Sequence, residues 1–394
     1  MQFYNLPLEI IQIILQSVAR DTLASASLVC KTWRSILLPL LFQAVQFDRR
    51  RSGNRWQDMF LNVPIHGTDG GSLLPSYVNR LRVELYMDRQ GLEDFYSVTT
   101  KMNNLKHLDW TVSNFQGKEV DWYGTLVRLC QELPKLRSLS LTMAQNEIPL
   151  GDLDEIVPLT NLLELSITLD GLTGEDPDDE LPNTLVEFIR GAPNIESLSL
   201  AFEEDDERGA APWGSVDLFS ELGSHCFPNL RMLETKSLYL VPIDNYSGPE
   251  FRQFIRSNNK LQKIILSTDG YDGSPKLLHP PPLIVTPADM EEMMPSIRHF
   301  GGPGLLVGEL LKSELAKQIQ LLELREPGAS ELGDLHDLLL DFDDSILVGL
   351  PTLKGLCYFN SYGESDGWEA ITDLLSKLAT RLPVLQELIL ENSE

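Results

Sequence analysis

The chain has 394 residues and a formal net charge of −26; 42% of its residues are hydrophobic and 23% charged, which is typical of globular proteins. Residues 1–60 hold seven Lys or Arg against four acids, a balance of +3, which leaves −29 for the remainder. Such an acidic body would repel phosphate backbones, so we expect no nucleic acid partner. The longest apolar run near the start, 36–42, is far shorter than the roughly 20 residues that span a bilayer, so we expect no membrane association.

Cysteine and histidine usage excludes several kinds of site. The cysteines are about a hundred residues apart, at Cys30, Cys130, Cys226 and Cys357, which argues against a disulfide framework and favours a reducing compartment. The six histidines show no metal-ligand spacing, so we expect neither a metal nor a cofactor. No basic stretch precedes an apolar core at the N-terminus, so we expect an intracellular location, cytoplasmic or nuclear.

The first predicted element is a helix that is apolar around most of its circumference. Nine apolar residues lie between Leu6 and Ala19, and a helix of that kind must be buried nearly all round. Pro7 suits the first helical position, because its missing N–H would be unpaired there anyway. Glu9, two residues further on, is favourable for the helix dipole.

Two further helices are predicted over 23–28 and 29–42. Three helices in about 40 residues lie at the edge of what folds unaided, and they cannot themselves cover the whole circumference of Ile10–Val18. We therefore expect another polypeptide to bury the second face of the first helix. The alternative is that this module caps the structure that follows, because repeat arrays need polar-faced ends.

These helices carry a motif. Leu6-Pro7-x-Glu9 and the paired aliphatics after it are followed about twenty residues later by Leu28-Val29-Cys30-Lys31-x-Trp33-Arg34, and together they resemble an F-box over residues 5–42. The resemblance implies a three-helix module that docks onto a Skp-type adaptor and so links the protein to a cullin–RING ubiquitin ligase. By motif match, the adaptor-binding residues would be Leu6, Pro7, Glu9, Ile10, Ile14, Leu28, Val29, Cys30 and Trp33.

A repeated phrase runs through the rest of the chain: Pro or Asn, then apolar-x-x-apolar-x-apolar. The second apolar position serves as a marker, and the markers are Leu108, Leu139, Leu165, Leu198, Leu233, Ile264, Phe300, Leu322, Leu356 and Leu388. Leu81 is a weaker copy, and the intervals between markers range from 22 to 36 residues. The short alternation predicts a strand with one buried face. Helices are predicted between strands over 122–133, 183–191, 248–258, 288–294 and 367–382.

A strand, a loop and a helix in about 30 residues resemble the leucine-rich-repeat plan. We predict an α/β fold with an F-box-like module over 1–42 and a leucine-rich-repeat-like solenoid (horseshoe) of about ten to eleven irregular repeats over 43–394. The repeats are degenerate, because the position that usually carries Asn or Cys carries other residues: Ala144, Asp170, Glu203, Asp269, Pro327 and Ser361.

In each strand the apolar side chains point inward to the core. The residues that alternate with them should therefore lie on the concave surface of such a solenoid. Extended surfaces of this kind bind macromolecules. We therefore predict a protein substrate held by His107, Asp109, Ser138, Ser140, Glu164, Ser166, Ser197, Ser199, Glu234, Lys236, Lys263, Glu323 and Arg325. Acidic clusters at 175–180 and 203–207 both follow a strand and should project from one edge. Each alone is typical of a solvated loop, and together they allow the hypothesis of a basic substrate segment.

Two segments resemble catalytic or phosphate-binding motifs, but each lacks residues that the motif requires. Residues 363–367 match G-x-S-x-G, but no histidine follows Ser365 to act as its base, so we reject a hydrolase and expect no catalytic residues. Gly301-Gly302-Pro303-Gly304 lacks the following Gly-Lys-Ser/Thr of a phosphate loop and predicts a turn. The leading hypothesis is a non-catalytic substrate receptor of a ubiquitin ligase, and the alternative is a scaffold without a role in ubiquitination.

Overall fold

The computed structural model describes residues 8–48, 74–85, 87, 89–112, 121–144, 158–172, 181–204, 215–236, 249–266, 285–302, 304–325, 350–360, 382 and 384–392. The chain forms two compact units, Met1–Met143 and Ala144–Glu394. They are called unit 1 and unit 2 here, and each is described by itself.

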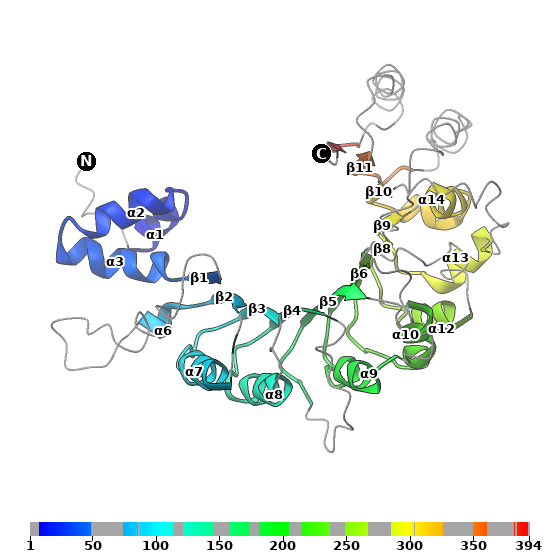
Figure 1. Ribbon diagram of the computed structural model, residues 1–394. Helices are drawn as coiled ribbons and strands as arrows, with labels where there is room; N and C mark the ends of the chain where they lie inside the picture. Colours follow the sequence, from blue (N-terminus) through cyan, green and yellow to red (C-terminus); the bar gives the residue numbers. More distant parts are fainter. Residues whose placement is uncertain are drawn as a thin grey trace. The chain divides into compact units, whose positions relative to one another are not determined.

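Unit 1 begins with three helices and continues as a parallel sheet with a helix after most strands (Figure 1). Its described elements are α1 (Leu8–Gln16), α2 (Arg20–Ser27), α3 (Lys31–Leu41), β1 (Ala44–Asp48), α6 (Leu74–Tyr77), β2 (Arg80–Leu85), α7 (Arg89–Thr99), β3 (His107–Val112), α8 (Trp122–Glu132) and β4 (Ser138–Ala144). Within the described residues, β1 to β4 are parallel and adjacent in chain order.

Unit 2 repeats the alternation of strand and helix (Figure 1). Its described elements are β5 (Glu164–Leu172), α9 (Asn183–Arg190), β6 (Ser197–Glu204), α10 (Ser215–Leu222), β7 (Met232–Lys236), α12 (Pro249–Ser257), β8 (Lys263–Leu266), α13 (Pro287–Met293), β9 (His299–Gly302), α14 (Gly304–Leu311), the 3₁₀ helix η4 (Glu314–Gln318), β10 (Leu321–Arg325), β11 (Gly355–Asn360) and β12 (Glu387–Asn392). Strands β5 to β12 are parallel and in chain order, and the labelled helices lie along one side of the sheet.

The repeat markers from the sequence are register partners in the sheets. Leu81 pairs with Leu108 and Leu108 with Leu139 in unit 1, and the markers of unit 2 pair in the same way from Leu165 to Leu388. Every marker except Leu388 is at most 5% exposed. The Leu-x-Leu alternation therefore sets which face of each strand packs against the helices.

The turn before each strand is held by a hydrogen-bond pattern that recurs along the sheet. The carbonyl oxygen of Asn79 accepts two hydrogen bonds from the next repeat, from the amides of Lys106 (2.8 Å) and His107 (3.1 Å). Within the described residues, ten backbone carbonyl oxygens each accept two hydrogen bonds from successive amides of the next repeat. They belong to Gln43, Asn79, Lys106, Leu163, Glu196, Arg231, Gln262, Arg298, Gln320 and Lys354. The positions of these turns define the N-terminal edge of each sheet.

Side chains add further bonds between neighbouring turns. Asn104 donates to the carbonyl of Ser76 (2.6 Å), Asn194 to that of Thr160 (2.8 Å) and Lys260 to that of Pro228 (2.7 Å). Each donor immediately precedes the buried Leu or Ile of its turn. Because these described turns use their predecessors as acceptors, polar bonds as well as the core keep neighbouring repeats aligned.

Asn258 makes the most extensive of the described side-chain contacts at a turn. Its side chain is 2% exposed, its Oδ1 accepts from the Phe227 amide (2.8 Å), and its Nδ2 donates to the Phe254 (2.8 Å) and His225 (3.2 Å) carbonyls. Removing this side chain would leave buried backbone groups unpaired.

The core lies between the sheet and the helices and is rich in aromatic residues. In unit 1 the ring of Trp110 packs against Phe95 (centroids 5.0 Å apart) and Trp122 (6.2 Å). In unit 2 the ring of Phe254 packs against Phe219 (5.2 Å) and Phe227 (6.3 Å).

The predicted α/β class with a helix between strands agrees with the structure, and the parallel sheets are consistent with a solenoid. Four predicted helices, 122–133, 183–191, 248–258 and 288–294, correspond to α8, α9, α12 and α13; the fifth, 367–382, lies outside the described residues. Among the described residues there are twelve strands, one more than eleven repeats would supply, because residues 44–48 form β1 ahead of the first copy. The assignment as leucine-rich repeats stays a prediction.

The prediction of a turn at Gly301-Gly302 is wrong, because both residues lie in β9. A Cβ at Gly301 would lie 3.2 Å from Cβ of Glu323 and 3.4 Å from Cγ1 of Ile265. The glycine therefore leaves room for side chains of both neighbouring strands and does not reverse the chain.

Candidate adaptor-binding surface

The three N-terminal helices share a small core. Ile11, Leu15, Leu23 and Leu37 are each at most 7% exposed and pack together. The side chains that pack against this cluster while remaining partly exposed are Val18, Ala26, Trp33, Ile36, Leu40 and Leu41. Ile11 and Leu15 are four residues apart, so they place one face of α1 against α2 and α3.

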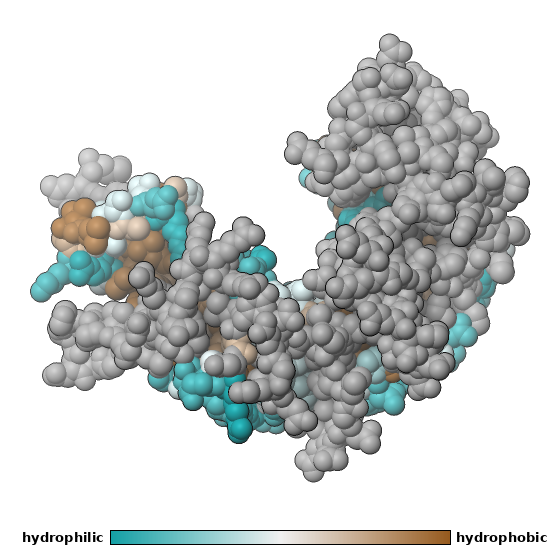
Figure 2. All heavy atoms as spheres, in the orientation of Figure 1, coloured by the Kyte–Doolittle hydropathy of each residue, from teal (hydrophilic) through white to brown (hydrophobic). Residues whose placement is uncertain are grey.

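A second apolar face of α1 remains exposed. Ile10, Ile13 and Ile14 are 43%, 63% and 41% exposed, and their spacing of three and four residues puts them on a common face. Figure 2 shows hydrophobic residues at the surface of this three-helix module. A soluble protein gains by covering such side chains, so this face is a candidate for contact with another molecule.

The end of α2 exposes two more large apolar side chains. Leu28 is 74% exposed and Val29 is 73% exposed. Cys30 follows as the N-cap of α3, and its exposed Sγ accepts a hydrogen bond from the Trp33 amide at 3.5 Å. We call Ile10, Ile13, Ile14, Leu28 and Val29 the apolar set.

The sequence missed one member of the apolar set. Ile13 is not among the positions of the F-box resemblance, although helical periodicity places it between Ile10 and Ile14. Leu6 and Pro7 lie outside the described residues, and Glu9 lies in α1 but its side chain is not described. The assignment of the nine predicted residues to adaptor binding stays a prediction.

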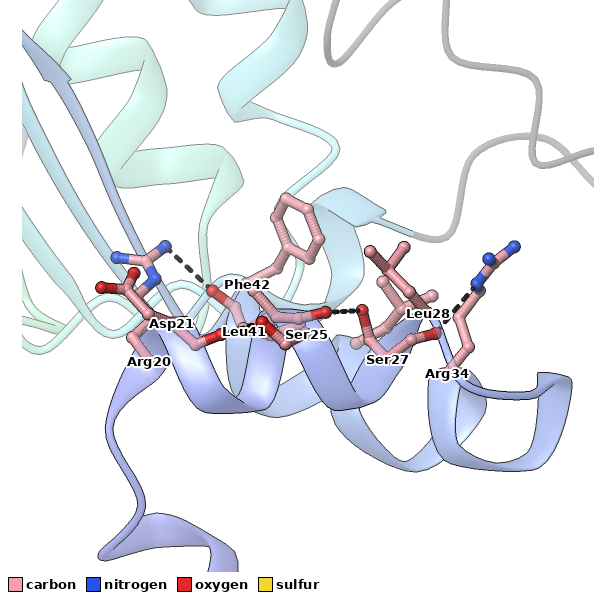
Figure 3. A pocket seen from close by; sticks show the side chains of 10 residues that line it. Arg20, Asp21, Ser25, Ser27, Leu28, Arg34, Leu41 and Phe42 are labelled. Atoms are coloured by element: carbon pink, nitrogen blue, oxygen red, sulfur yellow. Dashed lines mark hydrogen bonds between the residues drawn. The ribbon is translucent and has the colours of Figure 1, made fainter.

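A pocket of about 590 Å³ opens between α2 and α3, beside Leu28 (Figure 3). Arg20 and Arg34 lie at its two ends, where Nη2 of Arg20 donates to the carbonyls of Leu41 (3.0 Å) and Ala44 (3.2 Å). Nε of Arg34 donates to the Ser27 carbonyl at 3.4 Å. Arg20 therefore ties α2 to the end of α3 and to β1, which fixes the module against the first strand.

The residues predicted to contact a substrate alternate with the buried markers, so they lie on the sheet face away from the core. The half-buried ones are His107, Asp109, Ser138, Ser140, Ser166, Ser197, Ser199, Glu234, Lys263 and Arg325. Glu164 is exposed, Glu323 is buried, and Lys236 lies in β7 with its side chain not described. The structure brings together Ser199 and Glu234, whose side-chain oxygens are 3.5 Å apart. Substrate binding by these residues stays a prediction.

In unit 1, Asp109 lies near Arg82, with 3.6 Å between the carboxylate and Nε. Burial raises the pKa of Asp109, the Arg82 charge opposes this rise, and the Glu84 carboxylate adds to it. Arg82 also bonds to Glu84 at 2.5 Å, so this part of the sheet is an open network of charges.

In unit 2, Glu323 lies in a closed network. Its carboxylate is 8% exposed, one oxygen lies 2.5 Å from Nε2 of His299, and the other accepts from Nε (3.0 Å) and Nη2 (2.8 Å) of Arg325. Burial by itself would raise the pKa of Glu323, but the hydrogen bonds from His299 and Arg325 and their charges outweigh it and hold the pKa at about 2. Both oxygens are already paired, so Glu323 organises this face and has little capacity for a further ligand.

Two kinds of feature are absent from the residues that the structure describes. In that part of the chain, no helix is both long and apolar enough to cross a membrane. The same residues hold no group of three or more His, Cys, Asp and Glu side chains placed to bind a metal ion. The G-x-S-x-G segment and the acidic cluster at 175–180 lie outside the described residues.

Comparison with known families gives one match. Residues 3–42 match the family model of the F-box domain, a segment that contains all three helices of the module and the whole apolar set. No curated protein matches the chain significantly. The family match supports an F-box protein, on the residues where the structure exposes a second apolar face.

Proposed function

We propose that the protein is a non-catalytic substrate receptor of a Skp–cullin–RING ubiquitin ligase. In this proposal the apolar set binds a Skp-type adaptor, and the sheet face away from the helices binds a protein substrate. The observation that carries the proposal is the coincidence of the F-box match with exposed apolar side chains on α1 and at the end of α2.

The size of the apolar set agrees with a docking role. Burying its exposed fractions would contribute together roughly 4–9 kcal/mol, at roughly 1.5–3 kcal/mol for each fully covered side chain. Forming a complex costs an estimated 4–15 kcal/mol in lost motion. The apolar set therefore supplies a large share of the affinity but needs further contacts, for which Leu6 and Pro7 are the predicted source.

The receptor itself would perform no bond chemistry. By holding adaptor and substrate on one chain, it would raise the effective concentration of the substrate near the ligase. A scaffold would bind the same adaptor without leading to ubiquitin transfer, so the two proposals differ in the fate of the bound substrate.

Co-expression with a Skp-type adaptor tests the first step. We expect wild type to co-purify stoichiometrically and Ile13→Ser/Leu28→Ser to bind about a hundredfold more weakly, because two mostly exposed apolar contacts are lost. Val384→Ser/Leu388→Ser is the matched control, since these residues are 40% and 37% exposed in unit 2. An adaptor that does not co-purify with wild type, or that binds both variants equally well, would refute the proposal.

The second step is tested in cells. Proximity labelling with and without proteasome inhibition should recover proteins that accumulate on inhibition with wild type and do not accumulate with Ile13→Ser/Leu28→Ser. A set of neighbours whose abundance is the same in all conditions would favour the scaffold.

A further inference from the structure

Two groups of cations among the described residues differ in location. On the helices most of them pair with carboxylates, as Arg252 does with Asp289 (3.3 Å) and Lys312 with Glu309 (2.7 Å). Further pairs on helices are Arg128–Glu93, Arg190–Glu187, Arg256–Glu292 and Lys317–Glu314. The second group lies at the N-terminal edge of the sheets, where the turns lead into the strands.

Unit 1 has the denser arrangement of these edge cations. Five exposed cations lie in the turns before β3 and β4 and at the start of β2: Arg80, Lys101, Lys106, Lys135 and Arg137. We call them the N-terminal rim. Within the described residues, no carboxylate forms an ion pair with Arg80, Lys101, Lys106 or Lys135. The turn segments 100–107 and 131–138 contain one acid, Glu132, which accepts a hydrogen bond from the Tyr96 hydroxyl.

The hydrogen bonds of the turns bring these cations close together. The Lys106 amide donates to the Asn79 carbonyl (2.8 Å), next to Arg80, and the Lys106 carbonyl accepts from the Arg137 amide (2.9 Å). Nζ of Lys135 reaches Oδ1 of Asn104 at 2.6 Å, across the neighbouring turn. The rim therefore concentrates positive charge over three adjacent strands, about 10 Å at the usual strand spacing.

Stabilisation of helix ends explains only part of this charge. Lys101 and Lys135 follow the last residues of α7 and α8 by two and three positions, where a cation favours the helix dipole. Lys106 lies seven positions beyond the end of α7, outside the reach of its dipole, and Arg80 follows only the four-residue helix α6, whose dipole is small. In a chain of net charge −26, a basic rim in which Arg80, Lys101, Lys106 and Lys135 form no ion pair within the described residues indicates a binding surface.

Unit 2 provides a comparison. Its N-terminal edge carries about one exposed cation for each turn, as at Arg231 before β7, Lys260 before β8, Arg298 before β9 and Lys354 before β11. The N-terminal rim of unit 1 instead gathers five exposed cations at three adjacent strands, a width of about 10 Å. The unit 1 rim is the better site for a compact anionic group.

We propose that the N-terminal rim of unit 1 binds a short acidic segment of a partner protein. Three or four extended residues span the rim at about 3.3 Å each. Such a segment can lie within about one Debye length, ~8 Å, of the cations, whereas a long polyanion such as nucleic acid would extend over the acidic remainder of the chain. The rim shares no residue with the apolar set, so binding at the rim can be measured without the adaptor.

The test uses the full chain without adaptor and a fluorescein-labelled hexaglutamate peptide, with binding followed by fluorescence anisotropy at low salt. We expect Arg80→Glu/Lys106→Glu to weaken binding about tenfold, because two attractions become repulsions. Arg256→Glu/Lys312→Glu changes the net charge equally, also replaces one Arg and one Lys, and should stay within about twofold of wild type. If the reversal impairs folding, Arg80→Gln/Lys106→Gln replaces it.

Three results would overturn the proposal. They are absence of peptide binding to wild type, an equal loss in the rim and control variants, and unchanged binding in the rim variant. A ten-nucleotide oligothymidine serves as the second probe. If it binds more tightly than hexaglutamate, the partner of the rim is a nucleic acid and the proposal of an acidic peptide is wrong. Because no adaptor is present, each of these outcomes is separate from failure of the proposed ligase role.

Discussion

The carboxylate of Glu323 is buried on the sheet face away from the helices, where desolvation disfavours its charge. A cation from its own strand, Arg325, and the imidazole of His299 on β9 offset this cost by direct hydrogen bonds. Gly301 on β9 leaves the space in which the Glu323 side chain lies.

Glu323→Gln should therefore destabilise unit 2 by roughly 2–3 kcal/mol near neutral pH, because Arg325 loses its charged partner. The folded pKa of Glu323, about 2, lies below its ordinary value, so the stabilisation exists above that ordinary value and is lost as the pH falls towards 2. Urea unfolding at pH 7 and at pH 3 measures this difference, which should be larger at pH 7.

The control for this prediction is Glu164→Gln, at an exposed position of β5 on the same sheet face. It should change stability by less than about 0.5 kcal/mol. A Glu323→Gln variant as stable as this control at pH 7 would show that the network contributes no net stability.

For Glu323, the sequence predicts the sheet face on which the side chain lies but not its burial or its partner from another strand. Alternation with buried leucines placed Glu323 and Arg325 on the expected face, because side-chain direction in a strand follows a period of two. The partner His299 is 24 residues away and becomes a neighbour only through pairing of β9 with β10. Burial of Glu323 could not be predicted from its own strand.

At the scale of elements, α13 has an N-terminus defined by its sequence. Thr286 accepts a hydrogen bond from the Asp289 amide through its hydroxyl, and the Asp289 carboxylate accepts from the Thr286 amide. The hydrogen bonds that the Thr286 amide and hydroxyl donate to this carboxylate lower the pKa of Asp289. Pro287 occupies the first helical position, where its missing N–H costs nothing.

Thr286→Ala should lower the stability of α13 by about 1 kcal/mol, because it removes one half of this capping box. Faster amide hydrogen exchange in Met290 and Met293 would report the loss. Thr286→Ser keeps a hydroxyl at the same place and should exchange nearly as slowly as wild type. Equal exchange in the Ala and Ser variants would contradict the capping role.

The helix α1 shows what apolar periodicity can and cannot predict. The excess of apolar residues predicts two apolar faces, and the structure exposes one of them through Ile10, Ile13 and Ile14. Which face packs inward depends on α2 and α3, whose contact with Ile11 and Leu15 is a tertiary property. The F-box resemblance supplied the choice of Ile10 and Ile14, and the structure adds Ile13.

At the scale of the whole molecule, adaptor binding and stability of the strand array should be separable. Asn258→Ala removes three hydrogen bonds in unit 2 and should destabilise that unit by roughly 2–4 kcal/mol. Adaptor affinity should remain within about twofold of wild type, because the apolar set lies entirely in unit 1. Parallel thermal unfolding and adaptor titration test this, with Asn194→Ala, which loses one exposed bond, as the milder control.

A fall in adaptor affinity that tracks the lost stability of Asn258→Ala would contradict this separation. It would mean that the adaptor contacts residues whose order depends on unit 2.

Much of the strand array followed from the sequence because its period is local. The markers fixed the buried face of each strand and the register between neighbours, since all of them occupy equivalent places in the sheet. The basic rim did not follow from the sequence, because its cations are separated by whole repeats. They form a group only once parallel strands bring all the turns to one edge.

The turns have one more consequence, which concerns how this fold can change in length. The apolar residue of each turn precedes its marker by three positions in every repeat, as Leu105 precedes Leu108 and Leu353 precedes Leu356, although the repeats differ by up to 14 residues. The repeats therefore differ in length only in the part of each repeat that follows its turn and strand. The segment from turn to strand has a constant length in every repeat. Residues inserted after a strand therefore leave the stacking of neighbouring repeats unchanged. New recognition loops can thus be acquired there by insertion, whereas a single residue added between Leu353 and Leu356 would put the next strand out of phase with its neighbour.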